Sequence, residues 1–346
     1  MEFDVLIVGA GPAGSMTGWH IARAGFSALM IDKKKEVGVP VQCAEYIPAL
    51  LSKEISIDDG AIANKIKGLR LYFPDNSTYK FCAPGYILNR SVFDKYLTLN
   101  AVKAGACLWL KTKFLGVENG KILLYKNGRL LAVDAKIIVG ADGPNSRVSR
   151  LINQRYKDYV VAYQQELPLI EGMEYTEVYF DKNFFGGYAW LFPKKQSANV
   201  GVGVKTGYKI KVRDLFHQFV ERLVKEKKVF NTPIKTITGL IPVGGPVRTT
   251  GKNILLVGDA AGQTHPITGA GIAQAIVCGK FAAQAITDAL RKNDLNLLQT
   301  YEEKWQDLYL RELNRAIEKR KKMEENWHKL NDILKECWVS FPQYYG

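Results

Sequence analysis

Three short, mostly apolar runs in this chain each end directly before a glycine-rich segment. They occupy residues 3–8, 136–139 and 254–257, and the glycine-rich segments begin at Gly9, Gly140 and Gly258. A short apolar run between turn residues is typical of a strand that is buried on both faces of a parallel sheet. The pattern therefore predicts three parallel strands, each followed by a turn that opens into a helix.

A second pattern predicts elements that cover this sheet. Residues 91–103 form an amphipathic stretch without glycine, which predicts a helix with Ser91 as its N-cap. Residues 112–134 predict three short strands, because Asn119-Gly120 and Asn127-Gly128 are residue pairs that favour two-residue hairpin turns. This meander leads into the strand before Asp142 and is expected to cover one face of the sheet.

The remaining segments have a different composition. Residues 67–88 and 158–242 are rich in aromatic and β-branched residues, which predicts antiparallel strands, with a helix at 214–228. From residue 295 onward, large apolar side chains recur at steps of three and four, which predicts helices. Most of their apolar stripe is expected to pack on the body of the protein; the alternative is that an exposed part lies on a membrane.

The first glycine-rich segment, GAGPAG, has the spacing of a dinucleotide-binding turn. Gly9 allows the tight turn, Gly11 admits a pyrophosphate, and Gly14 lets the helix pack on the strand. Asp32 ends the next apolar run about 20 residues later, where a carboxylate can bind ribose hydroxyls. The segments GADGPNSR and GDAAGQTHPITGAG follow in the order expected of an FAD-binding protein. A purely structural turn is the alternative for the first motif.

Together these elements predict an α/β fold with a Rossmann-like FAD-binding domain, a β-meander and an inserted antiparallel substrate domain. The FAD-binding domain is expected to be discontinuous and the chain to end in a helical segment. The predicted ranges are 1–66, 89–157 and 243–294 for the FAD-binding domain, 67–88 and 158–242 for the substrate-binding domain, and 295–346 for the C-terminal helical segment.

Composition narrows the setting of the protein. The 346 residues carry a net charge of +14, which suits an anionic membrane, an acidic electron-donor protein, or a lysine-rich surface as found in thermophiles. No nucleic-acid-binding module is visible, so nucleic acid is not an expected partner. Five cysteines without a CxxC pair suggest reduced thiols and a cytoplasmic protein. The first strand begins at residue 3, so no signal peptide is expected, and no metal-ligand pattern is apparent.

The order of the three motifs around an antiparallel domain resembles the p-hydroxybenzoate hydroxylase type of flavoprotein. Four features further resemble the geranylgeranyl reductase family. These are PVQCAE at 40–45, NRSVFD at 89–94, YAWLFP at 188–193, and GDAAG at 258–262 running on to TGAG at 268–271. Ala44 stands where the family usually has glycine, and the chain is short for the family.

The resemblance implies roles for individual residues. Cys43 is expected beside the flavin ring, where its thiol could tune the flavin, relay a proton or shape the pocket, and it is the candidate catalytic residue. Arg90 could neutralise the pyrophosphate or be a surface ion-pair residue, and His265 could lie near the flavin or only pack. The expected FAD contacts are Gly9, Gly11, Pro12, Ala13, Gly14, Asp32, Lys33, Cys43, Ala44, Arg90, Asp142, Gly143, Gly258, Asp259, Pro266, Gly269, Ala270, Gly271 and Ile272.

Alternation places Tyr188, Trp190 and Phe192 on one face of a strand. On pattern alone these side chains are ordinary core. The resemblance implies instead that they and Pro193 line an apolar channel that holds an isoprenoid chain.

The resemblance therefore implies an FAD-dependent reductase that saturates carbon–carbon double bonds of isoprenoid (geranylgeranyl) chains, such as those of archaeal ether phospholipids. NAD(P)H and a ferredoxin remain open as electron donors. A cytoplasmic protein, in peripheral contact with the inner face of the cell membrane or free of it, is expected. The alternatives are an FAD-dependent monooxygenase acting on an apolar substrate and a prenyl-lipid- or quinone-binding flavoprotein that only transfers electrons.

Overall fold

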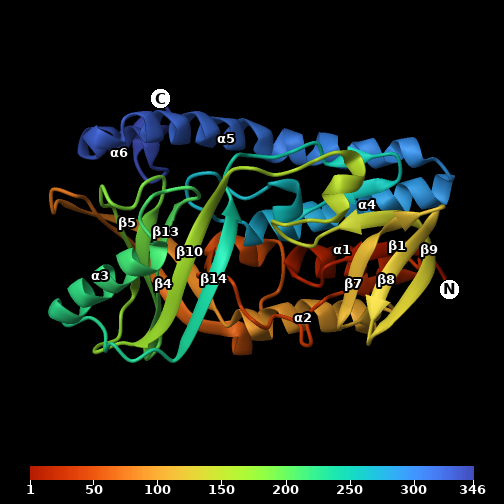
Figure 1. Ribbon diagram of the computed structural model, residues 1–346, viewed down its shortest axis with the longest axis horizontal. Helices are drawn as coiled ribbons and strands as arrows, with labels where there is room; N and C mark the ends of the chain where they lie inside the picture. Colours follow the sequence, from red (N-terminus) through yellow and green to blue (C-terminus); the bar gives the residue numbers. More distant parts are fainter.

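Two eight-stranded sheets organise the chain in the computed structural model, which describes residues 1–346 (Figure 1). The first sheet has the order β15-β16-β9-β1-β2-β6, and β7 and β8 extend it from β9. Its strands are β1 Glu2–Val8, β2 Ala28–Ile31, β6 Cys107–Trp109, β7 Thr112–Glu118, β8 Lys121–Lys126, β9 Arg129–Gly140, β15 Thr250–Gly251 and β16 Ile254–Leu256.

Strand β1 is the centre of the first sheet and is buried on both faces. It pairs in parallel with β2 and β9, and its side chains alternate between two cores. Val5 and Ile7 face the helices, while Leu6 and Val8 face the meander. The apolar run at residues 3–8 is continuous because neither face of this strand meets water.

The predicted meander is confirmed, with one simplification. Strand β9 pairs with β8 through its first half and with β1 through its second half, so the last meander strand and the parallel strand before Asp142 are one element. At both hairpin turns the Asn and the Gly have positive φ, as a two-residue turn of this kind requires.

The second sheet has the order β14-β10-β13-β12-β11-β4-β5-β3 and is antiparallel except between β11 and β4. It includes residues 46–48 and starts β4 at Ile62, so the predicted boundary between residues 66 and 67 falls inside a strand. The strands are β3 Tyr46–Pro48, β4 Ile62–Tyr72, β5 Thr78–Leu88, β10 Tyr159–Pro168, β11 Tyr175–Tyr179, β12 Tyr188–Lys194, β13 Ser197–Lys205 and β14 Lys235–Pro242.

Three expectations about helices need correction. Helix α2 begins at Arg90 with Asn89 as its N-cap, so Ser91 is inside the first turn rather than before it. The second glycine motif leads only into a short 3-10 helix, Val148–Ile152. The helix expected at 214–228 begins two residues earlier and ends three earlier. The α-helices are α1 Pro12–Arg23, α2 Arg90–Lys103, α3 Val212–Lys225, α4 Ile272–Lys292, α5 Gln299–Glu325 and α6 Leu330–Cys337.

Helices α5 and α6 join the two halves of the molecule. In Figure 1, α5 runs along one long side, from above the first sheet to above the second. Trp305 packs into the core around β1, whereas Leu334 and Trp338 pack against the second sheet. The predicted packing of the apolar stripe on the body is therefore confirmed. No helix combines the length and apolar character needed to cross a bilayer.

Arg320 of α5 connects the two halves directly. Its side chain is buried, and it donates to the carbonyl of Pro266 at 3.0 Å and to that of Gly186 at 2.7 Å. Pro266 belongs to the third glycine motif and Gly186 to the loop before β12. One guanidinium thus links the first domain, the second sheet and the C-terminal helix.

We expect Arg320→Met to lower the free energy of unfolding by about 3 kcal/mol, because two buried carbonyls and the nearby Glu324 lose their partner. The matched control is Arg311→Met, an exposed arginine on the same helix, which should change little. Urea denaturation of both variants measures the difference. Equal stability of the two variants would contradict the bridging role.

Candidate functional site

The turn between β1 and α1 is closely packed on one side and open on the other. A Cβ atom on Gly9 would lie 2.1 Å from the carbonyl oxygen of Ala141, and one on Gly14 would lie 1.9 Å from that of Gly9. A Cβ atom on Gly11 would meet nothing within 4 Å. The two outer glycines are therefore required for packing, while Gly11 faces space that a ligand can occupy. Pro12 and Ala13 form the first turn of α1 beside it.

Asp32 is fixed beside this turn by backbone groups. One carboxylate oxygen accepts the Ala10 N–H at 3.0 Å and the other accepts the Lys34 N–H at 2.9 Å. Each oxygen keeps a lone pair for a hydroxyl group. The neighbouring Lys33 is exposed.

The three glycine motifs meet because the strands before them are neighbours. Val8, Gly140 and Leu256 are in register across β1, β9 and β16. In the second motif, Asp142 accepts the Arg147 N–H at 2.7 Å, and its other oxygen is buried without a partner. Burial raises the pKa of Asp142. Gly143 follows with φ of 81°.

The third motif forms a compact loop before α4. After Gly258, Asp259 accepts a hydrogen bond from the Thr264 hydroxyl at 3.0 Å, and burial raises the pKa of Asp259. The His265 N–H donates to the Ala270 carbonyl, and His265 Nε2 lies 3.3 Å from Glu312 of α5, so His265 holds the loop together and ties it to α5.

Helix α4 begins at Ile272 with Gly271 as its N-cap, and no side chain caps it. Gly269, with φ of 67°, comes before it in the same loop. The first N–H groups of a 21-residue helix are thus without a side-chain partner, which suits an anion.

One face of the second sheet carries the predicted aromatic side chains. The register places Tyr188, Trp190, Phe192 and Lys194 of β12 opposite Gly203, Gly201, Asn199 and Ser197 of β13. A Cβ atom on Gly201 would lie 2.2 Å from the Trp190 ring, so the indole lies directly over this glycine. Trp190 is 5% exposed, and its ring N–H donates to Gln164 at 2.9 Å. We call this surface the aromatic face.

Tyr188 connects the aromatic face to the third glycine motif. Its hydroxyl donates to the carbonyl of Thr268, and burial raises the pKa of Tyr188. Its ring makes edge contacts with Trp190 and with Trp338 of the C-terminal segment. Phe192 is half-buried against Tyr46 at the other end of the face. The adjoining Pro193 is buried.

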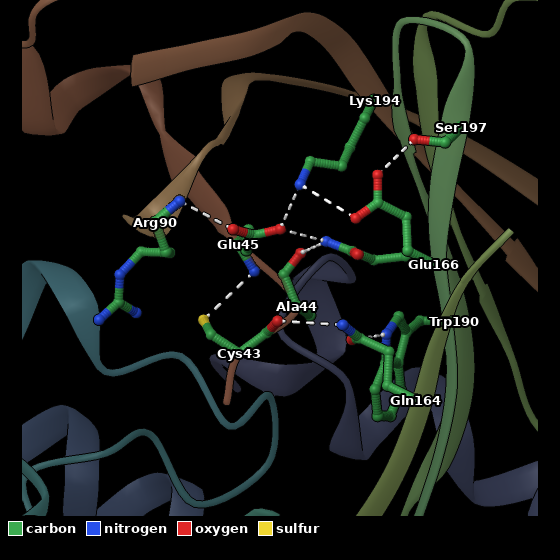
Figure 2. Close-up of polar contacts among 10 residues, drawn as sticks. Cys43, Ala44, Glu45, Arg90, Gln164, Glu166, Trp190, Lys194 and Ser197 are labelled. Carbon is green, nitrogen blue, oxygen red and sulfur yellow. Dashed lines mark hydrogen bonds and ion pairs between the residues drawn. The ribbon is translucent and has the colours of Figure 1, made fainter. Parts of the chain in front are cut away.

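The loop that carries Cys43 lies against the same sheet (Figure 2). The Cys43 carbonyl accepts the Gln164 side-chain amide at 3.1 Å, and the Ala44 carbonyl accepts that of Asn199 at 3.2 Å. The Cys43 sulfur accepts the Glu45 N–H at 3.2 Å. Burial raises the pKa of Cys43, and the nearby Arg90 guanidinium partly opposes this.

Arg90 is not a surface residue. Its guanidinium forms two hydrogen bonds with Asp94, at 2.8 and 2.9 Å, and the side chain is largely buried. Three of its five N–H donors remain for another partner. The ion pair expected at the surface is therefore internal. The remaining donors of Arg90 could still bind an anion such as a pyrophosphate.

A buried polar network behind Cys43 was missed from the sequence. The carboxylate of Glu45 accepts from the Arg90 N–H at 2.8 Å, from Lys194 Nζ at 2.7 Å and from the Asn199 amide at 2.8 Å (Figure 2). Glu166 lies 3.6 Å from Lys194 and accepts the Ser197 hydroxyl at 2.7 Å. The only sequence signals were that Glu45 is the last residue of the PVQCAE motif and that Lys194 directly follows the aromatic motif.

Comparison with known proteins places this geometry in a family. Residues 4–331 match the family described as lycopene cyclase protein. Digeranylgeranylglycerophospholipid reductase 1 of Methanopyrus kandleri is 38% identical, with 89% of this chain and 87% of the relative covered. The chain belongs to the digeranylgeranylglycerophospholipid reductase family. The resemblance drawn from the motifs is therefore confirmed.

Solved structures agree with membership of the digeranylgeranylglycerophospholipid reductase family. A geranylgeranyl bacteriochlorophyll reductase-like protein from Thermoplasma acidophilum is 32% identical, with a TM-score of 0.88 and coverage of 99% and 97% of the two chains. A flavin-dependent brominase at 17% identity has a TM-score of 0.77, with coverage of 98% and 91%, and shares the fold alone. The predicted fold class is confirmed.

The burial of Cys43 generates a prediction about its reactivity. The midpoint of alkylation against pH should lie above that of a cysteine in an unstructured peptide, because desolvation disfavours the thiolate. Exposed Cys82 and Cys107 should be alkylated faster at neutral pH. Mass spectrometry of peptides after timed iodoacetamide treatment measures both, with Cys43→Ser as the control. A Cys43 midpoint below the peptide value would contradict the expected environment.

Proposed function

We propose that this chain is an FAD-dependent reductase that saturates carbon–carbon double bonds in geranylgeranyl chains of archaeal ether phospholipids. The proposal rests on family membership and on one observation, the hydrogen bond from Tyr188 to the Thr268 carbonyl. This bond holds the aromatic face against the loop before α4. An apolar chain lying on that face would be next to whatever the glycine motifs bind.

The residues at the three motifs fit FAD. Gly11 faces open space, Asp32 has lone pairs for ribose hydroxyls, and the N-terminus of α4 is uncapped. The partnerless oxygen of Asp142 can bind a hydroxyl or, once protonated, donate to an oxygen. We propose the whole set of FAD contacts predicted from the sequence, with the N–H groups at Gly271 and Ile272 facing the pyrimidine end of the flavin.

FAD, when bound and reduced, would supply a hydride to the alkene. The chain would hold the alkene in a dry place and provide a proton. We propose that the channel is lined by Tyr188, Trp190, Phe192 and Pro193. Because the Trp190 side chain is buried, a bound isoprenoid chain would contact the edge of its indole ring. Burial raises the pKa of Cys43, which favours the protonated thiol, so Cys43 is proposed to hold a proton near the alkene.

The electron donor and the membrane contact are further parts of the proposal. The net charge of +14 favours an acidic donor such as a ferredoxin, with NAD(P)H as the alternative. Ile170, Phe230 and Ile234 are exposed on loops that backbone hydrogen bonds join at one end of the second sheet. Lys227 and Lys235 are exposed beside them. Apolar side chains bordered by lysines suit peripheral contact with an anionic bilayer.

We expect Gly11→Val to fold but to lose FAD, with affinity at least about tenfold weaker, because its side chain would occupy the open side of the turn. Gly116→Val is the matched control, since a Cβ atom there also meets nothing within 4 Å but lies in the meander. Flavin absorbance per chain after reconstitution measures the effect. Retention of the yellow colour by Gly11→Val would remove the support for FAD at this turn.

The reaction itself is tested by product mass and chromatographic mobility, with dithionite or an enzymatic donor under anaerobic conditions and with the enzymatic donor in a parallel aerobic reaction. Reduction adds two hydrogens for each saturated bond, whereas a monooxygenase requires oxygen and adds an oxygen atom. Cyclisation, the reaction that the name lycopene cyclase describes, leaves the mass unchanged. A flavoprotein that only transfers electrons leaves the lipid unaltered. Any of the last three results with a geranylgeranyl phospholipid would replace the proposed function.

A further inference from the structure

Glu45 occupies an unfavourable state in two respects. Its backbone has φ of 73°, a left-handed conformation that residues other than glycine and asparagine rarely adopt. Its side chain is 5% exposed, so a carboxylate is held away from water. Such features persist only where the surrounding structure determines them closely.

Donors from both halves of the molecule surround the Glu45 carboxylate. The Arg90 N–H comes from the start of α2, whereas Lys194 ends β12 and Asn199 lies on β13. Glu166 is the second carboxylate beside Lys194, at 3.6 Å, and is itself held by the Ser197 hydroxyl. The carboxylate is therefore a fixed point between α2 and the second sheet.

The backbone of the same residue contacts the thiol two positions before it. The Glu45 N–H donates to the Cys43 sulfur at 3.2 Å, and the left-handed backbone of Glu45 then directs the following chain away from this contact. Gln164 and Asn199 hold the two carbonyls of the intervening backbone. Gln164 also holds the indole of Trp190 on the aromatic face.

We propose that Glu45, held by Lys194, is a positioning residue that fixes the Cys43 sulfur relative to the aromatic face. This inference rests on the proposed function for its role in turnover, but the placement of the thiol can be measured without turnover. The charged and titratable groups that face the sulfur are Glu45, Arg90 and Tyr188. Lys194 acts on it only through Glu45.

The experiment uses the FAD-loaded full chain with Glu45→Gln, Lys194→Met, the double variant and Lys194→Arg. Glu45→Gln should lower the pH midpoint of Cys43 alkylation, because the nearby negative charge is removed. Both single variants should raise the alkylation rate at fixed pH by at least about threefold, and the double variant should be no faster than the faster single variant, because the pair acts as a unit. Lys194→Arg should stay close to wild type.

The matched control is Glu177→Gln. Glu177 is a fully buried carboxylate in the same sheet, paired with Lys228 at 2.9 Å, and it lies outside the network around Cys43. This variant should lose stability without a change in Cys43 alkylation. In turnover, the Glu45 and Lys194 variants should lower kcat more than they raise KM, because the apolar contacts that bind the chain remain.

Unchanged Cys43 alkylation in Glu45→Gln and Lys194→Met would overturn the proposal, as would equal changes in Glu177→Gln, which would show a loss of stability alone. Should Glu45→Gln fail to fold, Lys194→Met and Lys194→Arg decide the question by the same readout. If the wild type saturates no alkene while these thiol measurements follow the expectation, the proposed function fails and the positioning of Cys43 by Glu45 stands.

Discussion

The parallel register of β1 with its two neighbours is the constraint on which the rest of the structure depends. Parallel strands in register bring their carboxyl ends to one edge of the sheet, so the segments after Val8, Gly140 and Leu256 must meet there. The glycines of the first motif then allow α1 to leave the sheet at close range. Residues separated by about 250 positions are thereby brought to one edge of the sheet.

The second sheet adds a surface whose two ends differ in chemistry. Glycines on β13 make room for large rings on β12, which produces the aromatic face. Toward Lys194 the same face becomes polar and holds the loop of Cys43 through side-chain amides and one buried ion pair. The boundary between these ends lies at Gln164, which binds both the indole of Trp190 and the Cys43 carbonyl. An apolar chain and a reactive polar group can therefore be presented side by side.

Local patterns in the sequence predicted most of the fold because its strands are bounded by strong turn signals. The Asn-Gly pairs and the glycine motifs favour the positive φ values that their turns require. The hairpin strands and the turn after β1 were therefore predicted correctly. The N-cap at Ser91 was wrong because Asn89 already has the non-helical backbone of a cap. The helix after the second motif was wrong because the chain turns away after Ile152 toward the second sheet.

The polar network could not be predicted, since it depends on register between distant strands. Gln164, Glu166 and Asn199 look like ordinary outward-facing strand residues in the sequence. Only the pairing of β10 with β13, and of β13 with β12, places them over a loop more than 100 residues earlier. The family motifs include Cys43, Glu45 and the aromatic residues, but no motif marks Gln164, Glu166 or Asn199, which hold them.

The position of α5 has a consequence for how the protein is made. Trp305 packs into the core around β1, and Arg320 donates to the Pro266 carbonyl in the loop before α4, so the first strand of the chain packs with a helix some 300 positions later. Contacts between segments so far apart in the sequence slow folding, because the chain must first lose the entropy of closing a large loop. The core around β1 therefore stays incomplete until α5 is available to pack on it. A nascent chain of this protein is expected to need protection for its open sheet edges during that interval.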